Sequence, residues 1–188
     1  MVVGLSRSDW VEAGLALLLS EGLDALAVEP LARSLGTTKG SFYWHFADRA
    51  ELVATTLELW EQRETTEVIT GIAAIADPKQ RLAALGSGAY AHAATGTTLA
   101  TLLAHGNNPK VAEVLGRVTR TRLDFLANLY EDVDCDYPQL RARLAYALYL
   151  GMALLRGADP AGDPAEEDRG AFLALAVELM WPGASAAS

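Results

Sequence analysis

The chain has 188 residues and a formal net charge of −9; 51% of its residues are hydrophobic and 21% are charged. This composition excludes an intrinsically disordered protein, and the length is enough for one ordinary domain, or two small ones, with a real core. The apolar runs are too short to cross a membrane, and the acidic balance by itself does not indicate a nucleic-acid binder. The first residues lack the basic and apolar segments of a signal peptide, so we expect a cytoplasmic protein.

The first predicted helix begins at Ser6-Arg7-Ser8-Asp9, which fits the capping-box pattern of a helix start. Gly22 suits the end of this helix, because glycine readily adopts the backbone conformations of a helix cap. Apolar residues recur between these two points three and four positions apart, which places them on one helix face. The residues of this predicted buried face are Trp10, Ala13, Gly14, Leu17 and Leu18.

A second and a third short helix follow, separated by a glycine. The second helix is predicted over residues 28–35, and Gly36 supplies the positive φ that a tight turn requires. The third helix is predicted over residues 39–46, and Thr37-Thr38 offers its N-cap. Two short helices joined by such a turn are a candidate helix-turn-helix motif.

The third predicted helix has one apolar side. Phe42 and Phe46 lie four positions apart, so we expect them to anchor this helix to the first and fourth helices. Short polar and aromatic groups on the other side are what a recognition helix presents to a DNA groove. The residues left to face outward are Lys39, Ser41, Tyr43, Trp44 and His45.

The rest of the chain predicts further helices separated by turns. No run of alternating β-branched residues indicates a strand, and Asp48 is the expected N-cap of the fourth helix. We therefore expect an all-α fold of about nine helices, divided into a helix-turn-helix domain (residues 1–47) and a second helical domain (residues 48–188). The later helices are predicted over residues 48–76, 78–94, 97–104, 109–130, 138–156 and 165–180.

The segment from Trp10 to Leu57 resembles the DNA-binding signature of the TetR family of bacterial transcriptional regulators. The resemblance implies a homodimer that binds a near-palindromic double-stranded DNA operator through its N-terminal helices. It also implies a C-terminal domain for dimerisation and for binding a small organic effector, which usually relieves repression. The matching residues are Leu31-Ala32, Gly36, Thr38-Lys39-Gly40, Phe42-Tyr43-Trp44-His45-Phe46 and Arg49 through Glu51-Leu52.

The resemblance implies a role in DNA binding for each matching polar position. Lys39, Gly40 and Ser41 correspond to positions that face the major groove, where Lys suits a guanine edge or a phosphate. Thr38, Trp44, His45 and Arg49 correspond to positions that hold the phosphate backbone, and Tyr43 corresponds to a position that does both. The predicted DNA-binding set is Thr37, Thr38, Lys39, Gly40, Ser41, Tyr43, Trp44, His45 and Arg49.

Three positions depart from the family pattern. Ala27 stands where a Thr cap on the second helix is common, which removes one N-cap and one phosphate contact. Thr37 replaces the usual apolar residue after the turn glycine, and the basic N-terminal arm is reduced to Arg7. These departures leave an alternative open, in which the chain is a small-molecule binding protein on the same scaffold with a degenerate DNA-reading head.

The implied C-terminal functions lead to two further sets of candidates. An effector pocket is mainly apolar with a few polar groups. Its candidates are Trp60, Glu64, Tyr90, His105, Asn107, Arg122, Phe125 and Tyr149. Apolar stripes on the last two helices, with small residues for close approach, are expected to form a four-helix bundle across a twofold axis. The dimer candidates are Leu144, Ala147, Leu148, Gly151, Leu155, Phe172, Leu175 and Leu179.

Neither an enzyme nor a metalloprotein is predicted. No Ser/His/Asp or Cys/His set has the spacing of a catalytic group, and the single cysteine, Cys135, excludes an all-cysteine zinc site. His92 and His105 lie on separate predicted helices without a second ligand nearby. We therefore expect no catalytic residue, no metal and no cofactor.

Overall fold

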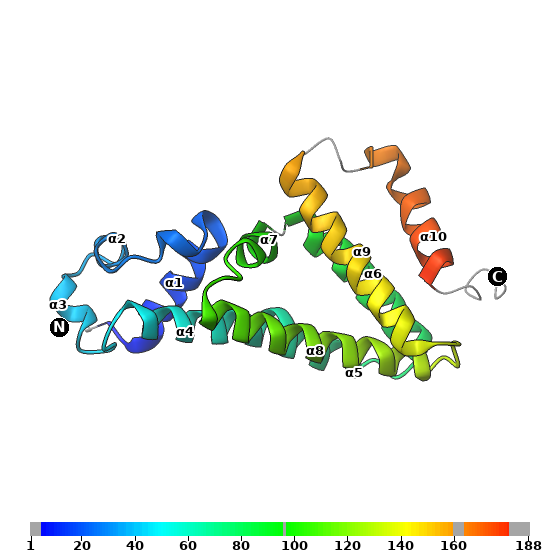
Figure 1. Ribbon diagram of the computed structural model, residues 1–188, viewed down its shortest axis with the longest axis horizontal. Coiled ribbons are helices and arrows are strands. Elements are labelled where there is room, and N and C mark those ends of the chain that lie inside the picture. Colours follow the sequence, from blue (N-terminus) through cyan, green and yellow to red (C-terminus); the bar gives the residue numbers. More distant parts are fainter. Residues whose placement is uncertain (1–4, 96, 160–163, 181–188) are drawn as a thin grey trace. The chain divides into compact units, whose positions relative to one another are not determined.

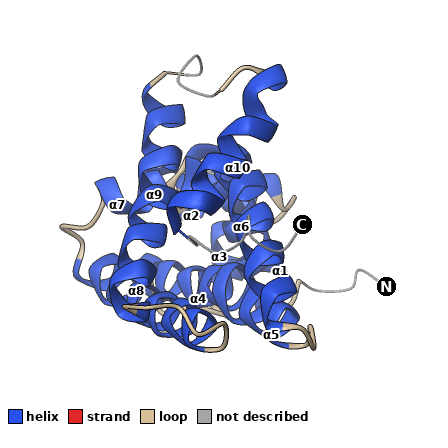
Figure 2. Cartoon of the chain, turned by 90° about the vertical axis from the view of Figure 1, so that its right-hand side faces the viewer, coloured by secondary structure: helices blue, strands red, loops and turns tan. Residues whose placement is uncertain are grey.

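The structure, a computed structural model, describes residues 5–95, 97–159 and 164–180 (Figure 1). Within these ranges the chain forms helices and loops and no strand (Figure 2), which confirms the all-α prediction. The elements are α1 (Arg7–Glu21), η1 (Leu23–Ala25), α2 (Val28–Ser34), α3 (Lys39–Phe42), α4 (Arg49–Glu61), η2 (Gln62–Glu67), α5 (Val68–Ala73), α6 (Pro78–Thr95), α7 (Thr97–Ala104), α8 (Pro109–Glu131), α9 (Pro138–Ala158), η4 (Glu166–Asp168) and α10 (Arg169–Met180).

The fourth predicted helix is interrupted rather than uniform. Helix α4 passes without a break into the π-helical segment η2 and then into α5, which ends at Ala73. A π-helical segment widens the helix and rotates the side chains that follow it, so one 3.6-residue period does not describe the whole segment. Taken as one continuous helix, α4–η2–α5 brings the described helices into correspondence with the nine predicted.

The chain divides into two compact units. Unit 1 takes its described residues from 1–67 and 101–118, and unit 2 takes them from 68–100 and 119–188. Unit 1 therefore holds the helix-turn-helix segment together with α4, η2 and the first half of α8. The predicted boundary between residues 47 and 48 concerns function and stays a prediction.

Helix α1 begins and ends where its sequence predicts. The Ser6 hydroxyl accepts from the Asp9 amide, and the Asp9 carboxylate accepts from the Ser6 amide, which is the predicted capping box. Gly22 ends the helix with a φ of 87°. The buried face is rotated from the predicted one because α1 is apolar nearly all around: Ala13 and Leu17 are half-buried. The buried residues are Trp10, Val11, Gly14, Leu15 and Leu18.

The core of unit 1 forms where α1 crosses α4. Phe42 stacks on Phe46 with centroids 5.2 Å apart, and Trp10 meets Phe42 edge-on at 5.4 Å. Both phenylalanines are buried, and the contact of Phe42 with Trp10 confirms the predicted anchoring to the first helix. Gly14 allows the close approach of the helices, because a Cβ there would lie 2.8 Å from Thr56 Oγ1.

Further contacts join the first half of α8 and the end of α7 to the rest of unit 1. The Arg117 guanidinium donates from Nε to Glu61 Oε1 at 2.8 Å, across α8 and α4. The His105 ring lies 3.2 Å from the Asp24 carboxylate. Hydrogen bonding to the Thr101 carbonyl and then to Asp24 raises the pKa of His105.

Unit 2 has its own small core. Ala127 and Tyr130 of α8 pack with Ala142 of α9, and Leu82 of α6 covers them. Burial raises the pKa of Tyr130 to about 12. None of the helices in the described ranges is long and apolar enough to cross a membrane. In the same residues no three His, Cys, Asp or Glu side chains gather as a metal ion requires.

Candidate nucleic-acid interface

The turn between α2 and α3 has the backbone that its sequence predicts. Gly36 adopts a φ of 65°, and the Thr37 amide donates to the Ala32 carbonyl at 2.9 Å. Leu31 and Ala32 are buried, so the small side chain of Ala32 lies inside the motif. Ala27 is the N-cap of α2 and makes no side-chain cap bond, as the departure from the family pattern predicts.

Helix α3 is shorter than predicted. It spans Lys39 to Phe42, and Thr38 caps it by accepting from the Ser41 amide at 3.4 Å. The chain then tightens, because Trp44 and His45 donate to carbonyls only three positions back, at 3.3 and 2.9 Å. The predicted helix over residues 43–46 is therefore wrong. A turn presents these side chains instead.

The side chains at this end of unit 1 are strongly exposed. Trp44 is 86% exposed and Tyr43 is 54% exposed, although both directly follow the buried Phe42. Large apolar groups left in water are a sign of a binding surface. Thr38, Lys39 and Gly40 are also exposed, while Thr37, Ser41 and His45 are half-buried.

Lys39 has a partner on α2. Its ammonium donates to Glu29 Oε1 at 3.0 Å, and both side chains remain largely exposed. The hydrogen bond and charge of Glu29 raise the pKa of Lys39, and the same contact lowers the pKa of Glu29. Lys39 is therefore charged, and any anion that binds it must compete with an acidic side chain of the same motif.

Arg49 lies at the start of α4, as predicted, but its guanidinium bonds within unit 1. Nε donates to the Leu26 carbonyl, and a terminal nitrogen donates to the Leu23 carbonyl at 3.1 Å. These carbonyls belong to the segment between α1 and α2. The side chain predicted to hold phosphate therefore also ties this segment to α4.

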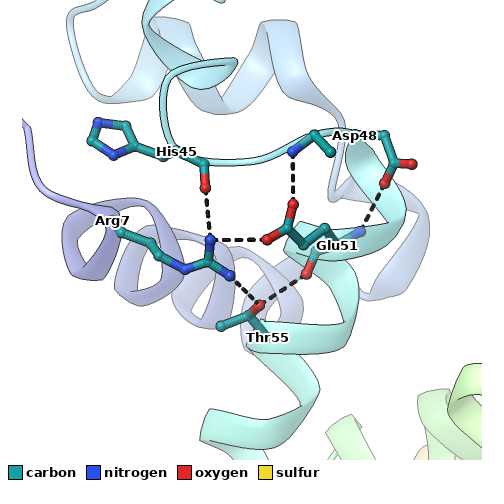
Figure 3. A network of polar contacts seen from close by, with 6 residues as sticks. Arg7, His45, Asp48, Glu51 and Thr55 are labelled. Carbon is teal, nitrogen blue, oxygen red and sulfur yellow. Dashed lines mark hydrogen bonds and ion pairs between the residues drawn. The ribbon is translucent and has the colours of Figure 1, made fainter.

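A polar network behind the turn was absent from the sequence prediction (Figure 3). One Arg7 nitrogen donates to the His45 carbonyl at 2.7 Å and to Glu51 Oε1 at 2.9 Å. The other terminal nitrogen donates to Thr55 Oγ1 at 3.2 Å, and the guanidinium lies 4.5 Å from the Phe46 ring centroid. The second Glu51 oxygen accepts from the Ala47 amide at 2.6 Å. Arg7 therefore belongs to the packing of the motif rather than to a free arm.

Unit 1 contains four of the eight predicted effector residues. Trp60 is buried on α4, and Glu64 is half-buried in η2. His105 bonds to Asp24, and Asn107 is exposed in the turn before α8.

Unit 2 contains the other four, and its contacts fall into two groups. Arg122 lies over the Tyr149 ring at 6.0 Å, and Tyr149 stacks near Tyr146. The Tyr90 ring centroid lies 5.9 Å from that of Phe172, and the Arg156 guanidinium lies 4.9 Å from the same Tyr90 centroid. The Tyr90 hydroxyl is buried and has no hydrogen-bond partner among the described residues. Phe125 is half-buried on α8.

The predicted dimer residues lie on α9 and α10. Leu144, Leu155 and Leu175 are 68%, 59% and 59% exposed, and Ala147 is exposed beside them. Leu148, Gly151 and Phe172 are half-buried, and the side chain of Leu179 lies outside the described residues. Leu140 and Leu154 are also exposed on α9, at 58% and 49%, and extend the predicted stripe.

The sequence of the helix-turn-helix segment resembles that of known proteins. Residues 11–56 match the family model of bacterial regulatory proteins of the tetR family. A 60-residue stretch is 30% identical to the HTH-type transcriptional regulator AcrR of Shigella flexneri; it covers 32% of this chain and 26% of that relative. The chain thus matches about a quarter of the curated relative's length.

Solved structures resemble the chain over nearly its whole length. A transcriptional regulator from Rhodococcus sp. Rha1 has a TM-score of 0.72 at 20% identity, with 94% of each chain covered. NalD of Pseudomonas aeruginosa, described as the secondary repressor of the MexAB-OprM multidrug efflux pump, has a TM-score of 0.63 at 21% identity, again with 94% of each chain covered. Residues 11–56 therefore match the N-terminal domain of bacterial regulatory proteins of the tetR family, and the whole chain resembles solved regulators in fold.

Proposed function

We propose that the protein is a dimeric, cytoplasmic transcriptional regulator of the TetR family and not an enzyme. It binds a near-palindromic operator in double-stranded DNA, represses transcription, and is released by a small organic effector. The observation that carries this proposal is the exposed Tyr43-Trp44 pair, which follows a buried phenylalanine at the end of a helix-turn-helix motif. The Tyr43 ring meets Phe42 edge-on at 5.2 Å, and more than half of Tyr43 and most of Trp44 stay open to a ligand.

The proposed DNA contacts divide into base reading and backbone holding. Lys39 reaches a guanine edge or a phosphate, and Gly40 permits close approach because it has no side chain. Thr38, Tyr43 and Trp44 contact phosphate from the exposed end of α3 and the turn after it. Thr37, Ser41 and His45 are half-buried and border this surface. Arg49 adds positive charge at the first turn of α4.

The proposed dimer uses the apolar faces of α9 and α10. Leu144, Leu155 and Leu175 are exposed by more than half in the single chain, and a symmetric partner would cover them. Gly151 and Ala147 are small and allow the helices of two copies to approach closely. A twofold dimer presents two copies of α3 to the DNA, so the operator has two related half-sites.

The proposed effector is a partly polar organic molecule held in unit 2. Support comes from the buried Tyr90 hydroxyl, which has no partner among the described residues, and from the Phe172 ring and the Arg156 guanidinium that lie near the Tyr90 ring. A buried hydroxyl without a partner is costly, so a ligand group that bonds to it gains that energy. The effector releases DNA only if it binds more tightly to the conformation of the dimer in which the two helix-turn-helix motifs no longer match the half-sites.

The test is selection of DNA by the full-length protein from a random duplex pool, followed by fluorescence anisotropy of the best sequence over a salt series. We expect a near-palindrome whose affinity falls with salt by a slope of about −0.9 for each neutralised phosphate. Failure to enrich any sequence contradicts the proposal. That result favours a ligand-binding protein with a degenerate DNA-reading head. The N-cap Ala27, which gives α2 no side-chain cap bond, is consistent with such a protein.

A further inference from the structure

The turn that carries Tyr43, Trp44 and His45 is held from behind by two residues outside it. This turn, residues 43–48, is called here the reading turn. The His45 carbonyl accepts from Arg7, and the Ala47 amide donates to Glu51. Arg7 and Glu51 also bond to each other at 2.9 Å (Figure 3). We propose that Arg7 and Glu51 are positioning residues for DNA recognition, which fix the reading turn in its DNA-binding conformation. This inference rests on the proposed function.

The contacts fall on backbone groups that the helices leave unpaired. The reading turn lies between the end of α3 and the start of α4. The His45 and Phe46 amides donate to the Phe42 carbonyl, but the His45 carbonyl and the Ala47 amide take their partners from outside the turn. Arg7 supplies a donor for one such group and Glu51 supplies an acceptor for another. With the buried Phe46 ring between them, these bonds fix the chain on both sides of a single residue.

Each positioning residue is itself held at a helix start. Arg7 is the first residue of α1, directly after the Ser6 capping box. Glu51 lies in the first turn of α4, where its own amide donates to the N-cap Asp48 at 2.9 Å. The position of the reading turn is therefore set by the first turns of α1 and α4, which pack against each other. The bond from Ala47 and then the bond from Arg7 lower the pKa of Glu51, so the carboxylate is charged at neutral pH.

Removing the charge of Glu51 or of Arg7 distinguishes a positioning role from direct contact with DNA. Loss of a carboxylate near a polyanion strengthens binding if electrostatics alone acts. Positioning predicts the opposite, because Gln has one acceptor oxygen and Glu51→Gln therefore loses the bond from either Arg7 or the Ala47 amide, which loosens the turn. Loss of Arg7 lowers the salt slope by about 0.9 if its guanidinium binds a phosphate, and leaves the slope unchanged if it acts through the turn.

The chain offers a matched control. Arg63 pairs with Glu12 at 2.5 Å, also between α1 and the α4–η2 helix, and these side chains are 43% and 46% exposed. The Arg7–Glu51 side chains are 46% and 38% exposed. The two ion pairs join the same helices with similar exposure, but within the described residues the control pair does not bond to the reading turn. If these substitutions weaken DNA binding only by lowering stability, variants of both ion pairs show the loss. If the reading turn is positioned as proposed, only variants of Arg7 and Glu51 show it.

The experiment compares full-length Arg7→Met, Glu51→Gln and the double variant with Arg63→Met and Glu12→Gln. The probe is the duplex that the wild-type protein selects from a random pool, titrated by anisotropy at several salt concentrations. Hydrogen exchange of residues 45–47 is measured in the free proteins. We expect Arg7→Met and Glu51→Gln each to weaken binding by about five- to tenfold, through lost preorganisation, with an unchanged salt slope.

The two losses of DNA affinity are expected to be non-additive, with the double variant close to either single variant. Each substitution breaks the same Arg7–Glu51 network. Exchange at Ala47 is expected to accelerate in these variants and not in the controls. Equal affinities for the Arg7 and Arg63 variants, tighter binding by Glu51→Gln, or a lower salt slope for Arg7→Met each overturn the inference alone. If the wild-type protein enriches no sequence, the proposed function falls and this inference falls with it.

Discussion

Substitution of Gly14 by alanine tests the close packing of α1 on α4. A Cβ at this position would lie 2.8 Å from Thr56 Oγ1 and 3.3 Å from Leu26 Cδ2, and both neighbours are buried. Overpacking of a core costs about 1–3 kcal/mol, and two buried neighbours that must move place this site in the upper part of the range. Alanine regains up to about 1 kcal/mol of helix propensity. We therefore expect Gly14→Ala to lower the free energy of unfolding by about 1–2 kcal/mol.

The assay is urea unfolding of the full-length protein, followed by circular dichroism. Gly86→Ala in α6 is the control, because a Cβ there meets nothing within 4 Å and only the gain in propensity remains. Thr56→Ala in the Gly14→Ala background removes the nearest obstacle, and its hydroxyl has no hydrogen-bond partner to lose in the described residues. We expect this second change to recover part of the loss. If Gly14→Ala is as stable as the wild type, the packing distance between α1 and α4 is wrong.

Three further predictions concern charge and assembly. Glu29→Gln frees the Lys39 ammonium from its internal partner, so we expect tighter binding to the selected duplex by anisotropy; weaker binding would show that Glu29 itself contributes. The pKa of His105 is raised by its hydrogen bond to the Thr101 carbonyl and then by its pairing with Asp24, so these contacts stabilise the fold fully below the ordinary value of 6.5 and lose this effect as the pH rises through the raised value. Asp24→Asn is expected to flatten the pH dependence of the unfolding midpoint over that window, and an unchanged profile would contradict the pairing. Leu144→Glu places a charge on the exposed face of α9, so we expect sedimentation to shift toward the monomer; an unaffected dimer would place the interface elsewhere.

Local signals were the most reliable part of the sequence. The Ser6 capping box, the positive φ of Gly36 and the Asp48 cap each depend on a few neighbouring residues, and all three are present. The anchoring of Phe42 and Phe46 follows from their spacing and a clear contrast with polar neighbours. These features are sufficient to place the motif.

Features that depend on distant parts of the chain were less predictable. The buried face of α1 was misplaced because apolar residues surround nearly the whole helix, so periodicity has no preferred direction. The contacts of Arg7 join residues 38 to 48 positions apart and involve polar side chains and backbone, which leave no periodic trace. Arg49 was expected to meet phosphate because it corresponds to a phosphate-holding position of the family, but local carbonyls are within reach of the same guanidinium. The sets proposed for the effector and the dimer rest on the family resemblance and remain predictions.

The first turn of α4 has a mechanical consequence for the whole reading head. Arg49 bonds to the backbone before α2, and Glu51 bonds to the backbone after α3. A rotation of α4 therefore carries both ends of the helix-turn-helix motif with it, as a rigid body. In the proposed dimer, an effector then changes the spacing and tilt of two undistorted heads rather than the shape of either one. Allosteric control and base recognition would accordingly be separable, because the same reading surface can be kept while the operator spacing it tolerates is altered.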